Sequence, residues 1–268
     1  MSNSQFSLDY YYNLIISDSK RHEKLHGIEY MEKHRKRFEE TVGFLSDCWG
    51  TKALEIGATD FFQVYLNEQG YEELWGTIFS TDIEEKFYTR RFDIGDFGVD
   101  ARILSLDIES ELFPFHEPYF DLIIMCEVIE HFDIDPMFAL VELNRILKMG
   151  GKLLITTPNS CSARNAYKAC LGYRPHFFMQ YSTDRSPHRH NFEHDIHSLL
   201  TLIHAAGFEV VRLETHDVFD EPDSQAIKFL QKNSMPLEFR GDDIFLLVQK
   251  VSTPKERWPQ SIYYRAGD

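Results

Sequence analysis

The sequence lacks a long apolar run. None approaches the roughly 18 residues that a membrane-spanning helix needs, and residues 1–18 have no basic stretch followed by an apolar one, as a secretion signal would. Cysteine is scarce as well, because Cys48, Cys126, Cys161 and Cys170 are the only four and form no C-x-x-C pair. The sequence therefore predicts neither a zinc site nor a disulfide framework, and we expect a soluble, cytoplasmic protein without a membrane partner.

Positive charge is in deficit. The 268 residues contain 28 Lys and Arg against 43 Asp and Glu, which gives a net charge of −15. Proteins that track nucleic-acid backbones neutralise phosphates with Lys and Arg, so we expect no nucleic-acid partner. The hydrophobic share of 43% and the charged share of 26% are those of a globular chain, and the length allows one large domain or two small ones.

The N-terminal part carries apolar residues at helical spacing. In residues 18–46, the side chains of Phe38, Val42 and Leu45 recur among many charges, which predicts one or two amphipathic helices. The basic run at residues 34–37 is expected to be a solvated face of such a helix.

Beyond residue 50, short apolar runs alternate with helical patterns. The expected strands are residues 52–57, 75–79, 101–106, 120–126, 152–156, 208–213 and 244–249. The expected helices are residues 61–69, 136–148 and 195–206, each followed by a glycine stop. This alternation predicts an α/β fold, with a doubly wound, mostly parallel sheet and helices on both faces.

The sequence divides into a cap, a sheet domain and a tail. Residues 1–50 are assigned to an N-terminal helical cap, residues 51–251 to the sheet domain, and residues 252–268 to a C-terminal tail. Within the sheet domain, residues 158–193 show no clean period, and residues 220–243 form a second irregular stretch. Long loops inside a compact domain are usually functional, so the first of these is expected to be a cover inserted over the site.

Residues suited to ligand binding follow the predicted strands. In a doubly wound sheet, ligands bind beyond the carboxyl ends of the strands. Glu55 and Gly57 end the first strand, where glycine lets the backbone approach a ligand and the next helix offers free N–H groups to an anion. Asp82 follows the second strand, near the place where nucleotide-binding folds put a carboxylate that binds ribose hydroxyls. Asp107 follows the third strand, and Cys126 ends the fourth.

Eight motifs follow one another between residues 52 and 159: LEIG, TD, LDI, LFPF, FDLII, EVIEH, LNRILKMGG and LLITTPN. In this order they resemble the class I S-adenosylmethionine-dependent methyltransferases that act on small molecules, and the last predicted helix and strand continue the resemblance. It implies a Rossmann-like methyltransferase fold with a seven-stranded sheet, S-adenosyl-L-methionine as the cofactor, and methyl transfer as the activity.

The resemblance also implies cofactor contacts, residue by residue. The methionine part of the cofactor would contact Glu55, Gly57, Ala58 and Thr59. The ribose would bind to Asp82, and the adenine to Asp107 and Ile108. Cys126 and Glu127 would form the floor of the site near the sulfonium. The chain departs from the family at the glycine-rich turn, because of its glycines only Gly57 remains, and Phe61 stands where small residues are common. This departure favours a narrower cofactor cleft, so weak cofactor binding and a lost activity both remain alternatives.

Three histidines are candidate catalytic residues. A hydroxyl that accepts a methyl group must lose a proton, and histidine titrates near neutral pH. His131 follows the fourth strand, and His188 and His190 lie in the expected cover. A metal site built from the last two with His194 and His197 fits no recognisable ligand pattern, so we expect no metal.

The acceptor is expected to be a hydroxyl of a small molecule. A nicotinamide dehydrogenase would need G-x-G-x-x-G at residues 57–62, which the chain does not have. Methyltransferases acting on nitrogen in polymers carry a D/N-P-P-Y/F turn where this chain has residues 126–129 as CEVI. The His-rich cover and the aromatic tail at residues 257–264 resemble, more faintly, enzymes that tailor polysaccharides and sugars.

A sugar or glycan-precursor hydroxyl is therefore the expected acceptor. A secondary-metabolite O- or N-methyltransferase and a non-catalytic module that keeps the fold are the alternatives, and the sequence leaves a homodimer open.

Overall fold

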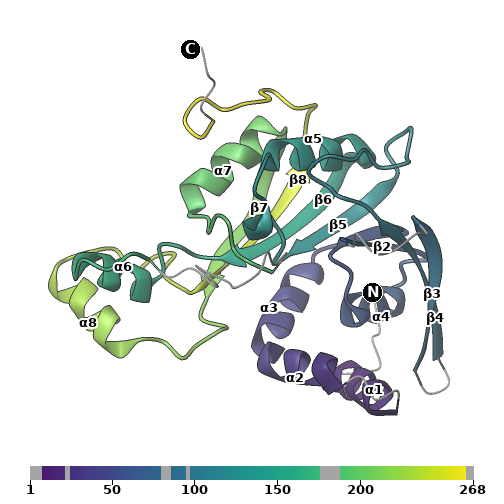
Figure 1. The fold of residues 1–268 in the computed structure, drawn as a ribbon, viewed down its shortest axis with the longest axis horizontal. Helices are drawn as coiled ribbons and strands as arrows, with labels where there is room; N and C mark the ends of the chain where they lie inside the picture. The colour runs from purple at the N-terminus through teal and green to yellow at the C-terminus, as the bar shows by residue number, and fades with distance from the viewer. Residues whose placement is uncertain (1–7, 22–24, 80–85, 95–96, 176–187, 264–268) are drawn as a thin grey trace.

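The computed structural model describes residues 8–21, 25–79, 86–94, 97–175 and 188–263. Within these residues, eight strands form one sheet: β1 Lys52–Ile56, β2 Glu73–Ile78, β3 Phe87–Ile94, β4 Phe97–Ser105, β5 Phe120–Cys126, β6 Leu147–Pro158, β7 Phe208–His216 and β8 Asp243–Lys250. Their order is β3-β4-β2-β1-β5-β6-β8-β7 (Figure 1). β4, β2, β1, β5 and β6 pair in parallel, whereas β3 on β4 and β8 between β6 and β7 pair antiparallel. The predicted α/β fold is confirmed.

The sheet differs from the prediction by one strand. β3 is an edge strand that the seven-stranded expectation did not include. It contains Arg90 and Arg91 in mid-strand, and charged side chains are typical of an exposed sheet edge, where they oppose pairing with other chains. The predicted helix stop at Gly150 is also wrong, because the preceding helix ends at Ile146 and β6 already runs through this glycine.

Helices cover both faces of the sheet (Figure 1). They are α1 Leu8–Arg21, α2 Leu25–Lys33, α3 Arg35–Leu45, α4 Asp60–Glu68, the 3₁₀ turn η1 Ile129–His131, α5 Pro136–Ile146, α6 Ala163–Cys170, α7 Ile196–Ala205 and α8 Ser224–Lys232. Side-chain caps begin several of them: Asp135 accepts from the N–H of Phe138, and Asp195 forms a capping box with Ser198. Residues 18–46, for which one or two helices were predicted, contain α2 and α3, and α1 begins before this range.

The hydrophobic core is split by the sheet into two layers. On one face, α5 and α7 bury Leu140, Leu143 and Leu199 against the strands. On the other face, α3 and α4 bring Phe38 and Phe61 together, with ring centroids 4.9 Å apart. Burial of large aromatic side chains contributes about 2 to 3 kcal/mol each, so this contact fixes the N-terminal helices to the sheet domain.

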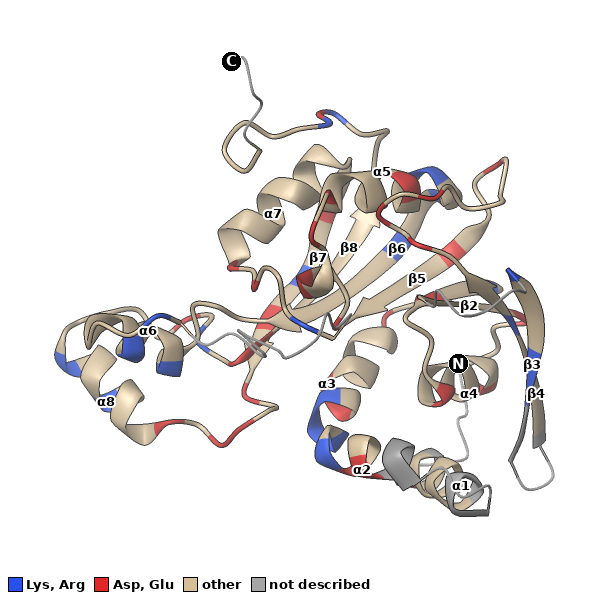
Figure 2. Cartoon of the chain, viewed as in Figure 1, with Lys and Arg blue, Asp and Glu red and all other residues tan. Residues whose placement is uncertain are grey.

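The N-terminal helices also carry a concentration of positive charge. Figure 2 shows Lys and Arg gathered on α3, where Arg35, Lys36 and Arg37 follow one another. Two of these side chains are exposed, as a solvated helix face requires, but Arg37 is only 5% exposed. The expectation of a wholly solvated run is therefore wrong for Arg37, and His34, at the start of the run, is half-buried against Tyr30 and Phe219.

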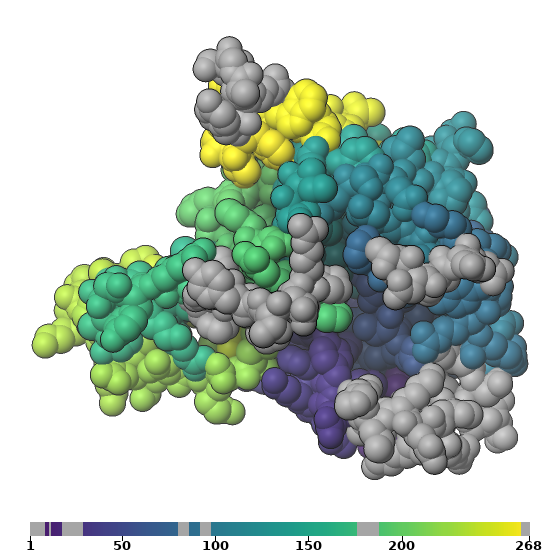
Figure 3. Space-filling model, in the orientation of Figure 1, coloured from purple at the N-terminus to yellow at the C-terminus, as the bar shows by residue number. Residues whose placement is uncertain are grey.

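α6 and α8 form a small lobe beside the sheet (Figures 1 and 3). They pack on each other through Ala226 and Leu230, which are fully buried, and through the rings of Tyr167 and Phe229, whose centroids lie 5.0 Å apart. Both stretches were expected to be irregular. The aromatic residues that were expected to help cover the site, Phe177, Phe178 and Tyr181, lie outside the described residues.

The C-terminal segment folds back onto α5. The hydroxyl of Tyr263 donates to Asp135 Oδ1 at 2.7 Å and accepts from the N–H of Met137 at 2.9 Å, and Arg257 forms an ion pair with Asp135. These contacts fix the beginning of the helix that follows η1. None of the described helices has the length and apolar character needed to cross a bilayer.

Candidate functional site

The turn between β1 and α4 has the backbone geometry expected of a ligand-binding loop. Gly57 adopts φ +73°, and a Cβ at this position would lie 3.1 Å from Val128 Cγ2, so a side chain would be both strained and crowded. The N–H groups of Gly57 and Ala58 donate to the Oγ1 and the carbonyl of Thr77, at 3.2 and 2.8 Å. The turn is thus held between β2 and the segment after β5.

Glu55 supports this turn from inside. Its carboxylate is 2% exposed and accepts hydrogen bonds from the N–H and the hydroxyl of Thr59, both at 2.8 Å, and from Gln63 Nε2 at 2.9 Å. Burial raises the pKa of Glu55 to about 8, although these three donors oppose the shift. All three contacts lie within the protein, so Glu55 orders the loop and the start of α4, and its direct contact with the cofactor stays a prediction.

Of the residues predicted to bind the nucleoside, the structure describes Asp107 and Ile108 but not Asp82. Asp107 follows β4 and is half-buried, and its carboxylate accepts from the N–H of Glu109 at 3.0 Å and the hydroxyl of Ser110 at 2.7 Å. Ile108 is 7% exposed. These contacts order the turn after β4 at the edge where the adenine is expected. Asp82 lies outside the described residues, so its role with the ribose stays a prediction.

Glu127 occupies a strained position directly after Cys126, the last residue of β5. Its φ is +54°, which is uncommon for any residue but glycine. The backbone is held by a hydrogen bond from the N–H of Glu127 to the carbonyl of Thr156, and the hydroxyl of Thr156 donates to Glu127 Oε1 at 2.7 Å. Such strain is concentrated at functional sites, which agrees with the prediction that this segment forms the floor of the site.

Arg37 enters the site from the N-terminal helix α3. Its Nη1 lies 3.5 Å from Glu127 Oε2, and its Nη2 donates to the hydroxyl of Tyr30 at 2.7 Å. Burial opposes the charged form, but these partners outweigh it and raise the pKa of Arg37 above its usual range. Sequence reasoning missed this residue, because a single inward-facing charge in a basic run has no local signal.

Two further buried carboxylates lie near this ion pair. Glu130, in η1, is fully buried and accepts from the hydroxyl of Thr157 at 3.1 Å through Oε2. Asp243, at the start of β8, is also fully buried. Burial and the charge of Glu127 raise the pKa of both carboxyl groups well above the usual range. Neither residue was among the candidates predicted from the sequence.

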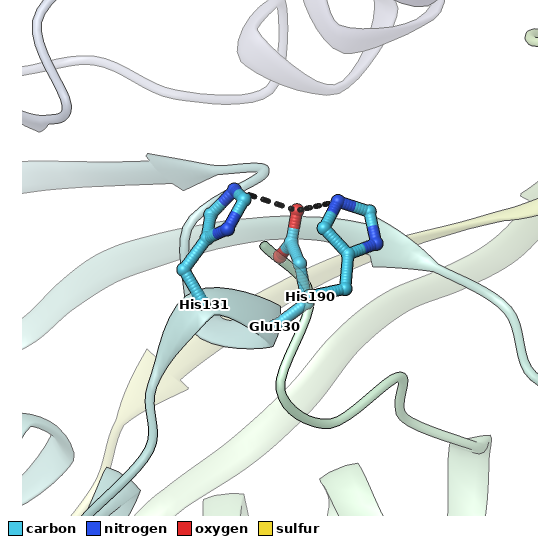
Figure 4. Close-up of side chains that lie close together, drawn as sticks. All are labelled: Glu130, His131 and His190. Atoms are coloured by element: carbon cyan, nitrogen blue, oxygen red, sulfur yellow. Dashed lines mark ion pairs between the residues drawn. The ribbon is translucent and has the colours of Figure 1, made fainter. Parts of the chain in front are cut away.

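His131 and His190 meet at Glu130, although they lie far apart in the chain. Their ring centroids are 5.0 Å apart, and their Nε2 atoms lie 3.8 and 4.0 Å from Glu130 Oε1 (Figure 4). The segment that carries His190 is fixed on η1, because the N–H groups of Asn191 and Phe192 donate to the carbonyl of Glu130. The structure thus brings together two of the three predicted catalytic histidines.

Two neighbouring histidines, His188 and His194, lie outside this cluster. His188 is exposed and close enough to His131 to help lower its pKa, an effect that is dominated by the burial of His131. His194 is buried, which lowers the pKa of its imidazole to about 4. A role for His188 in catalysis stays a prediction.

A shallow pocket on the described surface lies elsewhere, in the lobe. It is lined by residues of α6, α8 and the segment before β8, among them Arg164, Asp223 and Arg240. None of the predicted cofactor or catalytic residues lines it. The conserved geometry of a doubly wound sheet places ligands at the strand ends, so the residues after β1, β4 and β5 remain the candidate site.

A family model described as a methyltransferase domain matches residues 25–213. No curated protein shows significant sequence similarity to the chain.

Three solved structures share the fold. An S-adenosylmethionine-dependent methyltransferase from Archaeoglobus fulgidus is 17% identical, with a TM-score of 0.54, over 83% of this chain and 99% of that one. A Haloferax volcanii complex between the Trm112 methyltransferase activator and a methyltransferase matches with 12% identity and a TM-score of 0.54, over 85% and 94% of the chains. A Mesorhizobium loti S-adenosylmethionine-dependent methyltransferase matches with 14% identity and a TM-score of 0.51, over 80% and 98%. At these identities, the likeness concerns the fold.

Proposed function

Because this chain belongs to the methyltransferase domain family, we propose that it transfers a methyl group from S-adenosylmethionine to a hydroxyl oxygen of a small molecule. The family supports the donor and the reaction. The cluster of Glu130, His131 and His190 beyond the end of β5 carries the proposal of an oxygen acceptor, because it offers basic atoms beside the segment expected to hold the sulfonium.

The donor lies along the turn of Gly57 and the segment of Cys126 and Glu127. The turn is fixed by Thr77 and by Glu55, and the second segment by Thr156 and Arg37. These fixed loops suit a reaction whose main requirement is the in-line placement of donor and acceptor. Asp82 and Asp107 bind the ribose and the adenine in this proposal.

The reaction moves one methyl group and one proton. The acceptor oxygen forms a bond to the methyl carbon as the carbon–sulfur bond breaks, and S-adenosylhomocysteine leaves with the electron pair on its sulfur. The hydroxyl proton is taken up at Nε2 of His131 or His190. Both rings have Nδ1 hydrogen-bonded to an oxygen acceptor, namely the carbonyl of Arg189 and the carboxylate of Glu193, which leaves Nε2 as the basic atom.

Charge around the cluster supports a neutral acceptor. Glu127, Glu130 and Asp243 place three carboxyl groups near one another, with Arg37 as the buried cation among them. Such a site disfavours a phosphate or carboxylate next to the reacting oxygen. A sugar hydroxyl meets this requirement, so we propose a sugar or glycan precursor as the acceptor.

Two measurements test this proposal in sequence. Titration with S-adenosylhomocysteine in a calorimeter is expected to give saturable heat and a rise in melting temperature, and a chain that binds neither this compound nor S-adenosylmethionine would be a non-catalytic module. Mass spectrometry of sugar nucleotides and glycans incubated with the protein and S-adenosylmethionine is then expected to show O-methylation. Methylation confined to amines or to non-sugar hydroxyls would refute the sugar acceptor.

A further inference from the structure

Three ligand-type atoms converge beyond the carboxyl end of β5. Oε1 of Glu130 and the donor nitrogens of His131 and His190 all lie within 4.8 Å of one another. Figure 4 shows the Glu130 oxygen between the two imidazole rings, with one ring on each side. The first two residues belong to η1, and the third is fixed to it through the backbone of Asn191, so the arrangement does not depend on a long unsupported side chain.

The other nitrogen of each ring is already engaged. His131 Nδ1 lies 3.1 Å from the carbonyl oxygen of Arg189, and His190 Nδ1 lies 2.9 Å from Glu193 Oε1. An oxygen acceptor requires a proton on Nδ1 in both cases, so the neutral rings direct the lone pairs of their Nε2 atoms at Glu130. Metal-binding histidines are oriented in this way, with the second nitrogen donating to a carboxylate or a carbonyl.

Oε1 of Glu130 faces the two imidazole rings and has no hydrogen-bond donor among the described residues. This atom is buried, and within the same residues neither carboxylate oxygen of Asp243 has a hydrogen-bond partner. A buried carboxyl oxygen without a hydrogen-bond donor is unfavourable, and a cation held between this oxygen and the two imidazole rings would compensate it.

We propose that Glu130, His131 and His190 bind a divalent transition-metal ion, of which Mn²⁺ and Zn²⁺ are representatives. Imidazole nitrogen together with a carboxylate favours these ions over Mg²⁺ and Ca²⁺, which prefer oxygen alone. At metal–ligand distances of about 2.1 Å, ligand atoms lie roughly 3 to 4 Å apart. The separations of 3.8 and 4.0 Å from Glu130 Oε1 thus need only a small contraction around the ion.

The ion would deepen the proposed function, on which this part of the inference rests. Three protein ligands leave coordination positions for the acceptor hydroxyl, and a bound cation lowers the pKa of a coordinated hydroxyl or water. With both Nε2 atoms bound to the ion, the coordinated hydroxyl releases its proton to solvent water instead of to an imidazole, and the bond to the methyl carbon forms as the carbon–sulfur bond breaks. The expectation of no metal rested on His188, His190, His194 and His197, a set that contains neither Glu130 nor His131.

Metal binding alone tests the site, without any acceptor. Chelator-treated protein is titrated with MnCl₂, and free Mn²⁺ is followed by its electron paramagnetic resonance signal, with ZnCl₂ and MgCl₂ as competitors. We expect one Mn²⁺ per chain, displaced by Zn²⁺ far more readily than by Mg²⁺. Absence of binding at roughly millimolar Mn²⁺ and Zn²⁺ would overturn the proposal.

Variants separate this site from other surface carboxylates. Glu130→Gln and His190→Ala are expected to weaken Mn²⁺ binding roughly 100-fold or more, and Glu193→Gln, which leaves the three ligands in place, roughly 10- to 100-fold. His204→Ala, an exposed histidine of α7, is the matched control and should bind like wild type. If Glu193→Gln and either ligand variant all bound Mn²⁺ with the wild-type affinity, the ion would have to lie elsewhere.

A folding control keeps the interpretation clear. Circular dichroism and melting in the presence of chelator show whether each variant retains the fold, and Glu193→Gln serves if a ligand variant does not. Calorimetry with S-adenosylhomocysteine in chelator tests the donor site separately. Donor binding without metal binding would overturn only this inference, whereas metal binding without donor binding would overturn only the proposed function.

Discussion

Arg37, on a helix near the beginning of the chain, lies 3.5 Å from Glu127, which directly follows the central strand β5. The contact connects the N-terminal helices to the floor of the candidate site. The positive charge of the Arg37 guanidinium also lowers the pKa values of Glu130 and Asp243, against the larger effect of burial. The N-terminal helices therefore complete the electrostatics of the site in addition to covering α4.

Replacement of Arg37 by methionine is expected to destabilise the protein by about 3 to 5 kcal/mol at pH 7.5, because the buried carboxylates lose their cation. Loss of Arg37 raises the folded-state pKa values of Glu130 and Asp243 further, so the destabilisation should shrink as the pH falls toward 5 and these two carboxyl groups take up protons. Urea denaturation at several pH values measures this effect.

The control for this variant is Lys36→Met, which removes the neighbouring exposed charge of the same helix. Its effect should stay within about 0.5 kcal/mol. Equal losses in the two variants, or a loss in Arg37→Met that is independent of pH, would contradict the role given to the ion pair.

Gly57→Ala tests the turn after β1. The position combines φ +73° with a Cβ contact of 3.1 Å to Val128, whereas Gly70 has φ +92° with no described atom within 4 Å of its Cβ position. Both substitutions should cost about 1 to 2 kcal/mol of stability through the backbone. Only Gly57→Ala should weaken S-adenosylhomocysteine binding, by about tenfold or more, which calorimetry on both variants measures. Unchanged affinity in Gly57→Ala would remove this turn from the donor site.

His131→Ala and His190→Ala are expected to lower turnover roughly 100-fold, because each removes an Nε2 atom that is proposed to take up the acceptor proton or to bind the ion. Binding of S-adenosylhomocysteine should change little, since neither residue belongs to the expected donor contacts. Single-turnover rates with an acceptor found by the mass-spectrometry panel measure the effect. His204→Ala, on the exposed side of α7, should retain wild-type turnover, and wild-type rates in the two cluster variants would exclude them from catalysis.

The fold could be predicted where the local pattern and the tertiary environment agree. β5 was expected at residues 120–126 and runs from Phe120 to Cys126, because a central parallel strand is buried on both faces and gives a continuous apolar run. α7 was located within one residue at each end, since Asp195 caps it and Gly207 follows it. Local signals of this kind determine where an element begins and ends.

The remainder depends on contacts between distant parts of the chain. The place of α8 beside α6 depends on such contacts, because α8 buries Ala226 and Leu230 on this partner helix, although the helix itself had a local signal in its Asp223 cap and its apolar spacing. Arg37 is buried because Glu127 is there to pair with it. Similarly, His190 joins His131 only because its segment binds to the carbonyl of Glu130. The sequence suggested both histidines as candidates, but their shared site with Glu130 required the fold.

Glu55→Gln is expected to change the pH dependence of stability. Burial raises the folded-state pKa of Glu55 from 4.5 to about 8, so the folded protein holds a proton that the unfolded chain releases above pH 4.5. The contribution of Glu55 is therefore fully present below pH 4.5, falls by about 1.4 kcal/mol per pH unit above it, and is lost as the pH rises through 8. Gln is neutral at every pH, so the variant should lack this loss.

Urea denaturation between pH 5 and 9 should show that the free energy of unfolding of wild type falls relative to that of the variant up to about pH 8, with a constant difference above it. Glu72→Gln, at an exposed position, should follow the wild-type profile, and parallel profiles for Glu55→Gln and wild type would show that the carboxyl group stays ionised under the three hydrogen bonds that it accepts.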